Sequence, residues 1–184
     1  GYLYRERFTA EELESRDAMG VLWRGVRLSV RPEREELHDL RVEIEYATLG
    51  DSNVLRLSHR LCNLRHTEQV VQLTSYVFAG LGGAPAQLLL RGPHSVHRPN
   101  PVVSFIHGQP WGSLEHQDTG RCLLMVGRQG GVSLMDWGQD GRSLGSAHEV
   151  RLAGDDVCEH VYYLVLADSL QDAQAYQMLS DYHV

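Results

Sequence analysis

The sequence predicts a mainly β fold, an antiparallel β-sandwich with short N-terminal and C-terminal helices. Residues 39–79 contain three strand-length runs in which apolar and polar side chains alternate. About ten short segments of this kind follow one another along the chain, separated by turn residues. A helical period replaces the strand pattern only near the two ends of the chain.

The alternation in residues 39–79 predicts a sheet with one buried and one wet face, because successive side chains of a strand point to opposite sides. The apolar positions are Val42, Ile44, Tyr46, Leu55, Leu57, Leu61, Val71, Leu73 and Val77. The polar positions opposite them in the first two runs are Arg41, Glu43, Glu45, Arg56, Ser58 and Arg60. We expect Glu43 and Glu45 on the exposed face, paired with arginines of the next strand such as Arg56 and Arg60.

The N-terminal segment carries a helix-start pattern. Residues 9–12, Thr-Ala-Glu-Glu, form a capping box, which predicts a helix over about residues 10–18 that ends at Gly20. A strand over residues 21–30 and a charged connection at 31–36 should follow. Turns at 50–53 and 63–66 would join the three alternating runs into a meander of hairpins.

The second half should continue with short strands. Strands are expected over residues 86–90, 102–107, 121–126, 132–137, 148–152 and 157–167. Loops are expected over residues 91–101, 108–120 and 138–146, and a hairpin turn at 128–131. Residues 161–167 are apolar on both faces, which predicts a central strand. Asp168 should cap a helix over residues 169–181 with an apolar stripe at Leu170, Ala173, Tyr176 or Gln177, and Leu179.

The composition bounds the class of protein. The 184 residues are 42% hydrophobic and 22% charged, which suits a globular chain with a sizeable core. A net charge of −7 disfavours nucleic acid and anionic membranes as partners. No apolar run has the length of a transmembrane helix. All 17 basic residues are arginines, so Schiff-base chemistry on lysine is excluded within this chain.

Cysteine usage and the start of the chain give two further expectations. Cys62, Cys122 and Cys158 are odd in number and widely spaced, which predicts free thiols rather than disulfides or a zinc site. The sequence begins with Gly1 instead of Met, so we expect a piece of a larger protein in which residues 1–184 form one β-sandwich domain. No targeting segment is visible, so we expect a soluble chain and assign no compartment.

The sequence identifies no catalytic residue and predicts neither a metal nor a cofactor. The nucleophile pattern G-x-S-x-G does not occur, and no helix follows the glycine-rich residues 127–131, as a phosphate-binding loop would need. His94 and His97 lie three residues apart in an expected loop, where no helix face aligns them as metal ligands.

Residues 107–137 contain the best candidates for ligand contact. Trp111 sits among glycines and polar residues, with His107, Glu115 and His116 within five residues of it and Trp137 26 residues later. These five side chains would suit a sugar, because aromatic faces match C–H groups and polar groups match hydroxyls. The alternative is that Trp111 plugs one end of the sandwich core, as large aromatic side chains are mostly buried.

Two stretches resemble the galactose-mutarotase-like supersandwich family. Residues 54–63, Val-Leu-Arg-Leu-Ser-His-Arg-Leu-Cys-Asn, precede Val-Val-Gln-Leu at 70–73 and resemble a strand with its Leu-x-Asn turn. Residues 162–173 resemble the last strand and linker helix of such domains when they are attached to sugar-processing helical barrels. The resemblance implies a supersandwich fold and a carbohydrate context for residues 39–182. The family's catalytic histidine signature is not found, so no catalytic residue is carried over.

Three functions remain open from the sequence. The first is an accessory domain that binds sugar or braces an adjacent catalytic domain. The second is a mutarotase-like isomerase or lyase that uses His107 or His116 with a carboxylate as acid and base. The third is an assembly module that docks a partner, or a second copy of itself, through an edge strand or the C-terminal helix. The expected partners are therefore a carbohydrate or a catalytic domain, and neither nucleic acid nor a membrane.

Overall fold

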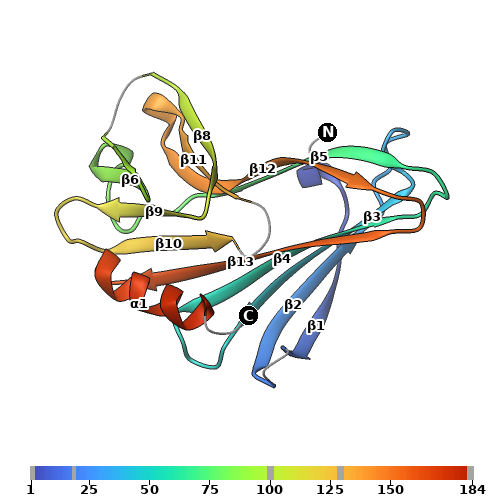
Figure 1. Cartoon of the computed structure of the whole chain (residues 1–184), viewed down its shortest axis with the longest axis horizontal. Coiled ribbons are helices and arrows are strands. Elements are labelled where there is room, and N and C mark those ends of the chain that lie inside the picture. Colours follow the sequence, from blue (N-terminus) through green and yellow to red (C-terminus); the bar gives the residue numbers. More distant parts are fainter. Residues whose placement is uncertain (1–2, 18–19, 99–101, 128–130, 182–184) are drawn as a thin grey trace. The chain divides into compact units, whose positions relative to one another are not determined.

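A computed structural model describes residues 3–17, 20–98, 102–127 and 131–181 (Figure 1). The chain divides into two compact units. Unit 1 consists of Gly1–Gln72 and Glu149–Val161, and unit 2 consists of Leu73–His148 and Tyr162–Val184. Both are built from antiparallel strands, as the sequence predicts. In the described part, no helix is long and apolar enough to cross a membrane.

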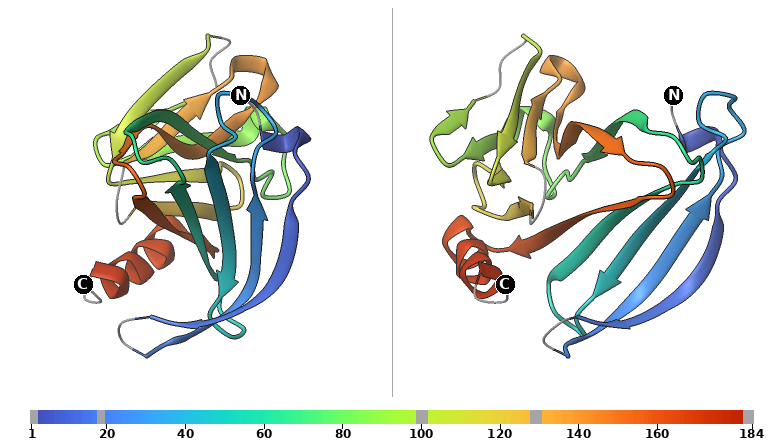
Figure 2. Two further views of the ribbon diagram at one scale, coloured as in Figure 1. Left: turned by 90° about the vertical axis from the view of Figure 1, so that its right-hand side faces the viewer. Right: turned by 45° about the vertical axis from the view of Figure 1, so that its right-hand side comes forward.

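Unit 1 is a twisted sheet whose neighbouring strands are visible in Figure 2. Its strand order is β1-β2-β3-β4-β13. The strands are β1 (Thr9–Arg16), β2 (Leu22–Val30), β3 (Leu40–Thr48), β4 (Val54–Asn63) and the first half of β13 (Val157–Ala167), and a 3₁₀ turn (Leu3–Arg5) precedes them. The predicted turn at 50–53 joins β3 and β4 into a hairpin in which Glu45 lies opposite Ser58.

The predicted N-terminal helix is wrong, because this segment is strand β1. Its eight residues pair with β2 along their whole length, from Thr9 opposite Ser29 to Arg16 opposite Leu22. Among the β1 side chains only Leu13 is buried, so a helix here would have had almost no apolar face to pack. Pairing with an open strand edge supplies eight residues with backbone partners, which outweighs a local capping preference.

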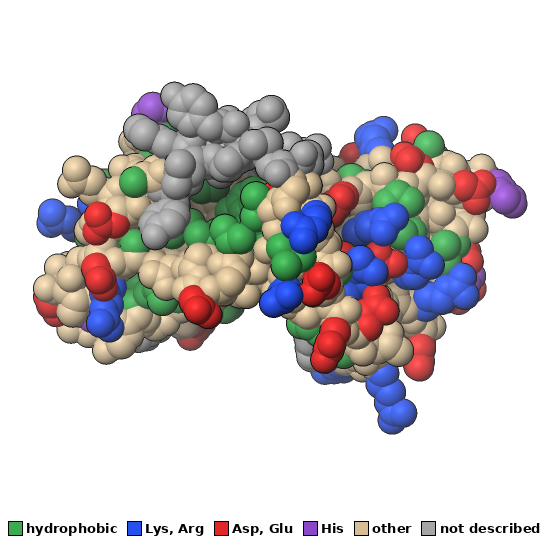
Figure 3. All heavy atoms as spheres, turned by 90° about the horizontal axis from the view of Figure 1, so that it is seen from below, with side chains coloured by type: hydrophobic (Ala, Val, Ile, Leu, Met, Phe, Trp, Pro, Cys, Tyr) green, Lys and Arg blue, Asp and Glu red, His purple; other side chains and the backbone are tan. Residues whose placement is uncertain are grey.

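The predicted ion pairs in unit 1 are confirmed, but the expected exposure of the two glutamates is wrong. Arg56 pairs with Glu45 at 3.2 Å and Arg60 pairs with Glu43 at 3.3 Å. Glu45 is nevertheless only 8% exposed, because Arg27 reaches it from the other neighbouring strand at 2.7 Å. Figure 3 shows basic and acidic side chains interleaved over β1 to β4.

The opposite face of β3 also departs from strict alternation. Val42, predicted to be buried, is buried, and Ile44 is half-buried. Tyr46, predicted on the same face, is exposed. Whether a strand residue is buried therefore depends on the side chains that cover it. Arginines from both neighbouring strands cover the Glu45 carboxylate, whereas the neighbouring Tyr46 stays exposed.

Unit 2 is a sandwich of two sheets. One has the order β13-β10-β9-β6-β7 and the other the order β5-β12-β11-β8. The strands are β5 (Gln69–Val77), β6 (Leu88–Gly92), β7 (Ser95–His97), β8 (Ser104–Gln109), β9 (Trp111–His116), β10 (Cys122–Gly127), β11 (Val132–Asp136) and β12 (Arg142–Leu152). The sheets meet closely at Gly112, where an added Cβ would lie 2.4 Å from Leu134 and 3.1 Å from Leu144. The core of unit 2 is therefore apolar, with Leu114, Leu134 and Leu144 fully buried.

In two of the predicted hairpins, β4–β5 and β10–β11, the two strands belong to different sheets. β5 pairs with β12 and not with β4, so the predicted meander ends after β4. β10 pairs with β9 and β13, whereas β11 pairs with β8 and β12. The predicted hairpin between β10 and β11 is therefore wrong, and residues 128–130 of its turn lie outside the described residues. A turn signal shows that the chain reverses, but not which sheet it enters next.

Three segments predicted as loops contain strands. Residues 108–120 include β9, residues 91–101 include β7, and residues 138–146 include a short 3₁₀ turn (Gly138–Asp140) and the start of β12. β9 was hidden by its polar side chains, Ser113 and Glu115, which are nonetheless hydrogen-bonded to each other at 2.8 Å. Partnered polar side chains are compatible with a central strand, so composition alone misassigned this one.

The C-terminal part agrees best with prediction. β13 lies between β4 and β10 in the strand order, as its two apolar faces indicate. The helix is α1 (Leu170–Asp181), but its cap is Ser169 and not Asp168, since the backbone N–H of Asp172 donates to Ser169 Oγ at 3.1 Å. Ala173 is fully buried. The side chains of the predicted stripe from residue 176 onward are not among those that the structure describes.

Candidate functional site

The five side chains predicted to contact a ligand all belong to unit 2, but they lie in three separate places. Trp111, Glu115 and His116 are on β9, His107 is on β8, and Trp137 directly follows β11. Since side chains alternate along β9, Trp111 and Glu115 share one face of the strand and His116 points to the other.

His116 holds a turn together. The side chain is buried, and its Nδ1 accepts hydrogen bonds from the backbone N–H groups of Asp118 at 3.2 Å and Thr119 at 3.3 Å. A nitrogen that accepts carries no proton, so the neutral ring is protonated at Nε2. Gly83 packs against that Nε2, where an added Cβ would lie 2.3 Å away. The imidazole is thus enclosed on both sides and fixes the segment after β9.

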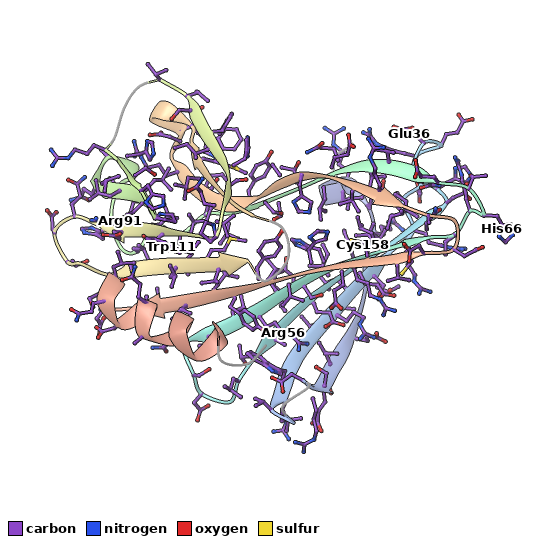
Figure 4. All side chains as sticks on the ribbon, in the orientation of Figure 1. Glu36, Arg56, His66, Arg91, Trp111 and Cys158 are labelled. Carbon is purple, nitrogen blue, oxygen red and sulfur yellow. The ribbon has the colours of Figure 1, made fainter. Side chains whose placement is uncertain are left out.

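Glu115 is the centre of a small polar group on the opposite face of β9. Arg91 binds it with two hydrogen bonds, Nε to Oε1 at 2.7 Å and Nη2 to Oε2 at 3.2 Å, and Ser113 Oγ also donates to Oε1. This two-pronged geometry is the strongest form of an arginine–carboxylate pair. Trp111 is half-buried and lies four residues from Glu115, about 13 Å along the strand. Figure 4 labels Arg91 and Trp111.

A thiol borders this polar group but is no nucleophile. Cys122 lies opposite Glu115 in the β9–β10 register and is fully buried. Burial, with smaller contributions from the Glu115 and Asp172 carboxylates, raises the pKa of the Cys122 thiol to about 11. The thiol therefore stays protonated near neutral pH, and a thiolate is the reactive form. Within the described residues no three His, Cys, Asp or Glu side chains gather as a metal-ligand set.

The other two predicted residues belong to a line of aromatic side chains on the sheet β5-β12-β11-β8. Trp137 lies in its middle, with the Tyr76 ring edge-on at 5.3 Å and the Phe105 ring edge-on at 4.8 Å. Tyr76 is 44% exposed and Phe105 43% exposed, while Trp137 is half-buried between them. We call Tyr76, Trp137 and Phe105 the aromatic row.

His107 extends the aromatic row along β8. Its ring centroid lies 6.4 Å from that of Phe105, and its Nδ1 is 2.8 Å from Ser133 Oγ on β11. The side chain is exposed. One end of the aromatic row thus carries a polar ring that can exchange hydrogen bonds with a bound hydroxyl group.

Hydrogen bonds beneath the aromatic row hold Trp137 in one orientation. The indole N–H donates to Ser143 Oγ at 2.9 Å. Directly before Trp137, the buried Asp136 pairs with Arg142 at 3.3 Å and accepts the backbone N–H of Gly138 at 2.9 Å. The turn that presents the indole is therefore fixed on both sides, and a preorganised aromatic surface loses little entropy when a ligand binds.

Tyr76 and Phe105 are the residues that sequence reasoning missed. The available signal was the outward phase of β5, in which Val70, Gln72, Thr74 and Tyr76 alternate with the half-buried residues between them. That phase follows from the prediction that Val71, Leu73 and Val77 face inward. Nothing local brings Tyr76 to Trp137, 61 residues later, because strand order alone determines this contact.

Comparisons with known proteins identify the fold. A candidate aldose 1-epimerase from Klebsiella pneumoniae matches with a TM-score of 0.69 and 12% identity, over 94% of this chain and 58% of its own. The α-galactosidase AgaA from Geobacillus stearothermophilus, solved with stachyose, matches with a TM-score of 0.62 and 13% identity over 90% of this chain. The GalM/aldose epimerase homologue from C. elegans matches with a TM-score of 0.57 and 11% identity, over 86% of this chain and 69% of its own.

These likenesses concern the fold, since all three identities are far below those of close relatives. The fold is that of a galactose-mutarotase-like β-sandwich domain. The chain spans 58% of the length of the Klebsiella protein and 28% of the α-galactosidase. No protein-family model matches the sequence, and the search of curated proteins gave no significant match.

Proposed function

We propose that this chain is a carbohydrate-associated accessory domain that binds neutral sugars weakly on the aromatic row. The observation that carries the proposal is the aromatic row itself. Tyr76 and Phe105, each more than two-fifths exposed, flank Trp137, which a hydrogen bond to Ser143 fixes in place. Exposed aromatic rings that gather on one surface favour a binding function. Its fold neighbours include proteins described as an aldose epimerase homologue and an α-galactosidase, which supports a carbohydrate as the ligand.

The chemistry of the aromatic row favours a neutral sugar. Its three members carry no formal charge, and the acidic residue directly before Trp137, Asp136, is buried and paired with Arg142. The C–H face of a pyranose can stack on the exposed rings of Tyr76 and Phe105, and His107 offers a polar edge to hydroxyl groups. A small open surface of this kind should give a dissociation constant of roughly 1 mM, which corresponds to about −4 kcal/mol.

The catalytic alternative has weaker support. In the described residues, the imidazole hydrogen bonds of His116 go to backbone amides and that of His107 goes to a serine, so neither bond places a carboxylate beside the ring. An acid–base mechanism needs such groups to converge on one reacting atom. The α-galactosidase comparison, in which this fold fills 28% of a long chain, instead supports a role beside a catalytic domain.

A ligand titration tests the proposal. Galactose and stachyose are titrated into ¹⁵N-labelled protein and followed by NMR, with the Tyr76→Ala and Phe105→Ala variants in parallel. Removing either exposed ring should weaken binding at least about fivefold, or roughly 1 kcal/mol. The control is Leu166→Ala, which removes a side chain of similar exposure from the other sheet of unit 2.

The pattern of shifted signals decides the result. Shifts that centre on Tyr76, Phe105 and the Trp137 indole, and that disappear in the two variants but persist in Leu166→Ala, would support the proposal. Binding that both variants retain would place the sugar elsewhere. An absence of binding at 100 times the expected dissociation constant, about 0.1 M, would remove sugar binding as the function.

A further inference from the structure

We propose that the aromatic row binds a chain of at least three neutral sugars, laid across the strands, in preference to a single sugar unit. This inference rests on the proposed function, since it concerns the length and direction of the ligand on the same surface. The positions of the two exposed rings on the sheet determine both.

The aromatic row runs across the sheet from one end of the strand order to the other. Tyr76 belongs to β5 and Phe105 to β8, the first and last strands of the order β5-β12-β11-β8. Trp137 follows β11, and its indole N–H donates to Ser143 on β12, so the indole occupies the middle of the sheet. Neighbouring strands lie about 4.8 Å apart, so the path from β5 to β8 crosses three intervals, or roughly 14 Å. A ligand that touches both exposed rings must therefore lie across the strands.

The spacing of the rings requires more than one sugar. The strand order places Tyr76 and Phe105 on opposite sides of Trp137, with ring centroids 5.3 Å and 4.8 Å from the indole. The two rings are inclined to the indole at 78° and 66°, so neither is stacked face to face on it. A pyranose is close to a benzene ring in width, so a single sugar can cover one exposed ring but not both. A chain fits if its first and third sugars meet the exposed rings and its second sugar lies above the indole.

Each exposed ring has a hydrogen-bonding side chain next to it on its own strand. Thr74 is exposed and precedes Tyr76 by two residues, so both lie on the same face of β5. His107 lies beside Phe105, with ring centroids 6.4 Å apart, and its Nδ1 is 2.8 Å from Ser133 Oγ. The first and third sugars would thus each meet a ring for the C–H face and a polar group for the hydroxyls.

The two strands at the ends of the aromatic row suit a neutral chain. Neither β5 (Gln69–Val77) nor β8 (Ser104–Gln109) contains an aspartate, a glutamate or an arginine. A neutral chain can therefore cover these strands without burying a charged group, which would be costly. A sugar acid, in contrast, would find no arginine on either strand to pair with its carboxylate.

One chain that uses both exposed rings should bind more tightly than a single sugar. Once its first sugar is stacked, the third sugar is held close to its own ring, so the second contact is effectively intramolecular. We expect this contact to lower the dissociation constant at least about tenfold. A chain of four identical units that used only one ring would gain at most about fourfold, from the number of units that can occupy that ring. The two cases are therefore separable by measurement.

A series of β-1,4-linked galactose chains of one to four units tests the inference. Each is titrated into the ¹⁵N-labelled protein and followed by NMR, which also shows whether every variant is folded. From galactose to the four-unit chain, the dissociation constant of the wild type should fall at least about tenfold. In Tyr76→Ala and Phe105→Ala, which keep one exposed ring, this gain should shrink to about fourfold or less. Leu166→Ala, on the other sheet of unit 2, is the matched control and should keep the full gain.

The outcomes separate this inference from the proposed function. If galactose binds on the aromatic row but the longer chains gain about fourfold or less, the row binds single sugars and the inference is wrong. A tenfold gain that both single-ring variants retain would also overturn it, because the added contact would then lie away from the two rings. If neither galactose nor any longer chain binds, the proposed function itself fails.

Discussion

At Gly145, one methyl group decides whether two strands can approach. An added Cβ would lie 2.0 Å from the backbone carbonyl oxygen of Ser75, a distance that no real Cβ contact shows. Gly145→Ala should therefore push β5 away from β12 and lower the free energy of unfolding by about 2–4 kcal/mol. Urea denaturation followed by circular dichroism measures the change.

The matched control is Gly80→Ala, where the nearest atom to an added Cβ is the Gly83 carbonyl oxygen at 3.7 Å. That variant should unfold within about 0.5 kcal/mol of the wild type, since an ordinary contact replaces open space. Equal losses in the two variants would contradict close approach as the cause, because Gly→Ala by itself restricts the unfolded chain and does not destabilise the protein.

At the residue level, the sequence could select types of side chain but not their neighbours. Trp137 and His107 could be singled out because aromatic and imidazole groups suit ligand contact wherever they occur. Glu115 and His116 could be singled out for their polar groups, yet in the structure Arg91 binds Glu115 and two backbone amides donate to His116. Those partners come from other strands or from the local turn geometry, which no spacing rule encodes.

At the scale of one element, the sheet of unit 1 depends on Glu45. This carboxylate receives Arg27 from β2 and Arg56 from β4, and the Arg56 guanidinium also lies 5.3 Å above the Trp23 ring. Glu45→Ala would take this carboxylate from the largely covered Arg56 and, among the described residues, leave Arg27 with only the exposed Glu11 of β1 as a salt-bridge partner. We expect a loss of about 3 kcal/mol in the free energy of unfolding, measured by urea denaturation.

The comparison for Glu45→Ala is Glu14→Ala on the same sheet. Glu14 pairs with Arg24 at 3.1 Å, but both side chains are more than three-fifths exposed. Solvent screens such a pair, so its loss should change the stability by less than about 1 kcal/mol. Equal losses in the two variants would contradict the conclusion that burial makes the Glu45 pairs important.

Whole elements were predictable where the side-chain period was clear and unpredictable where pairing overrode it. The period of two identified β3 to β5 and the inward phase of β5, the continuous apolar run identified β13, and the helical period identified α1. β1 and β9 were missed because a capping box and a polar composition describe local preference, whereas both segments gain backbone partners by pairing with the next strand along the chain, β1 with β2 and β9 with β10. β10 and β11 were found, but their sheets were not.

At the scale of the whole molecule, connectivity predicts how the two units unfold. β5, β12 and β13 each begin in one unit and end in the other, so three strands belong to both. Unfolding one unit alone would break each of these strands in its middle and expose backbone hydrogen-bonding groups at three points. We therefore expect a single cooperative transition, as in a single domain of ordinary size.

Calorimetry with one variant from each unit tests this expectation. The ratio of the calorimetric to the van't Hoff enthalpy should be near one for the wild type. Glu45→Ala lies in unit 1 and Gly145→Ala in unit 2, and each should lower the midpoint of the same transition. At about 2–4 °C per kcal/mol for a chain of this size, both shifts should exceed 4 °C. Two separate transitions, each moved by one variant alone, would instead show that the units are independent domains joined by shared strands.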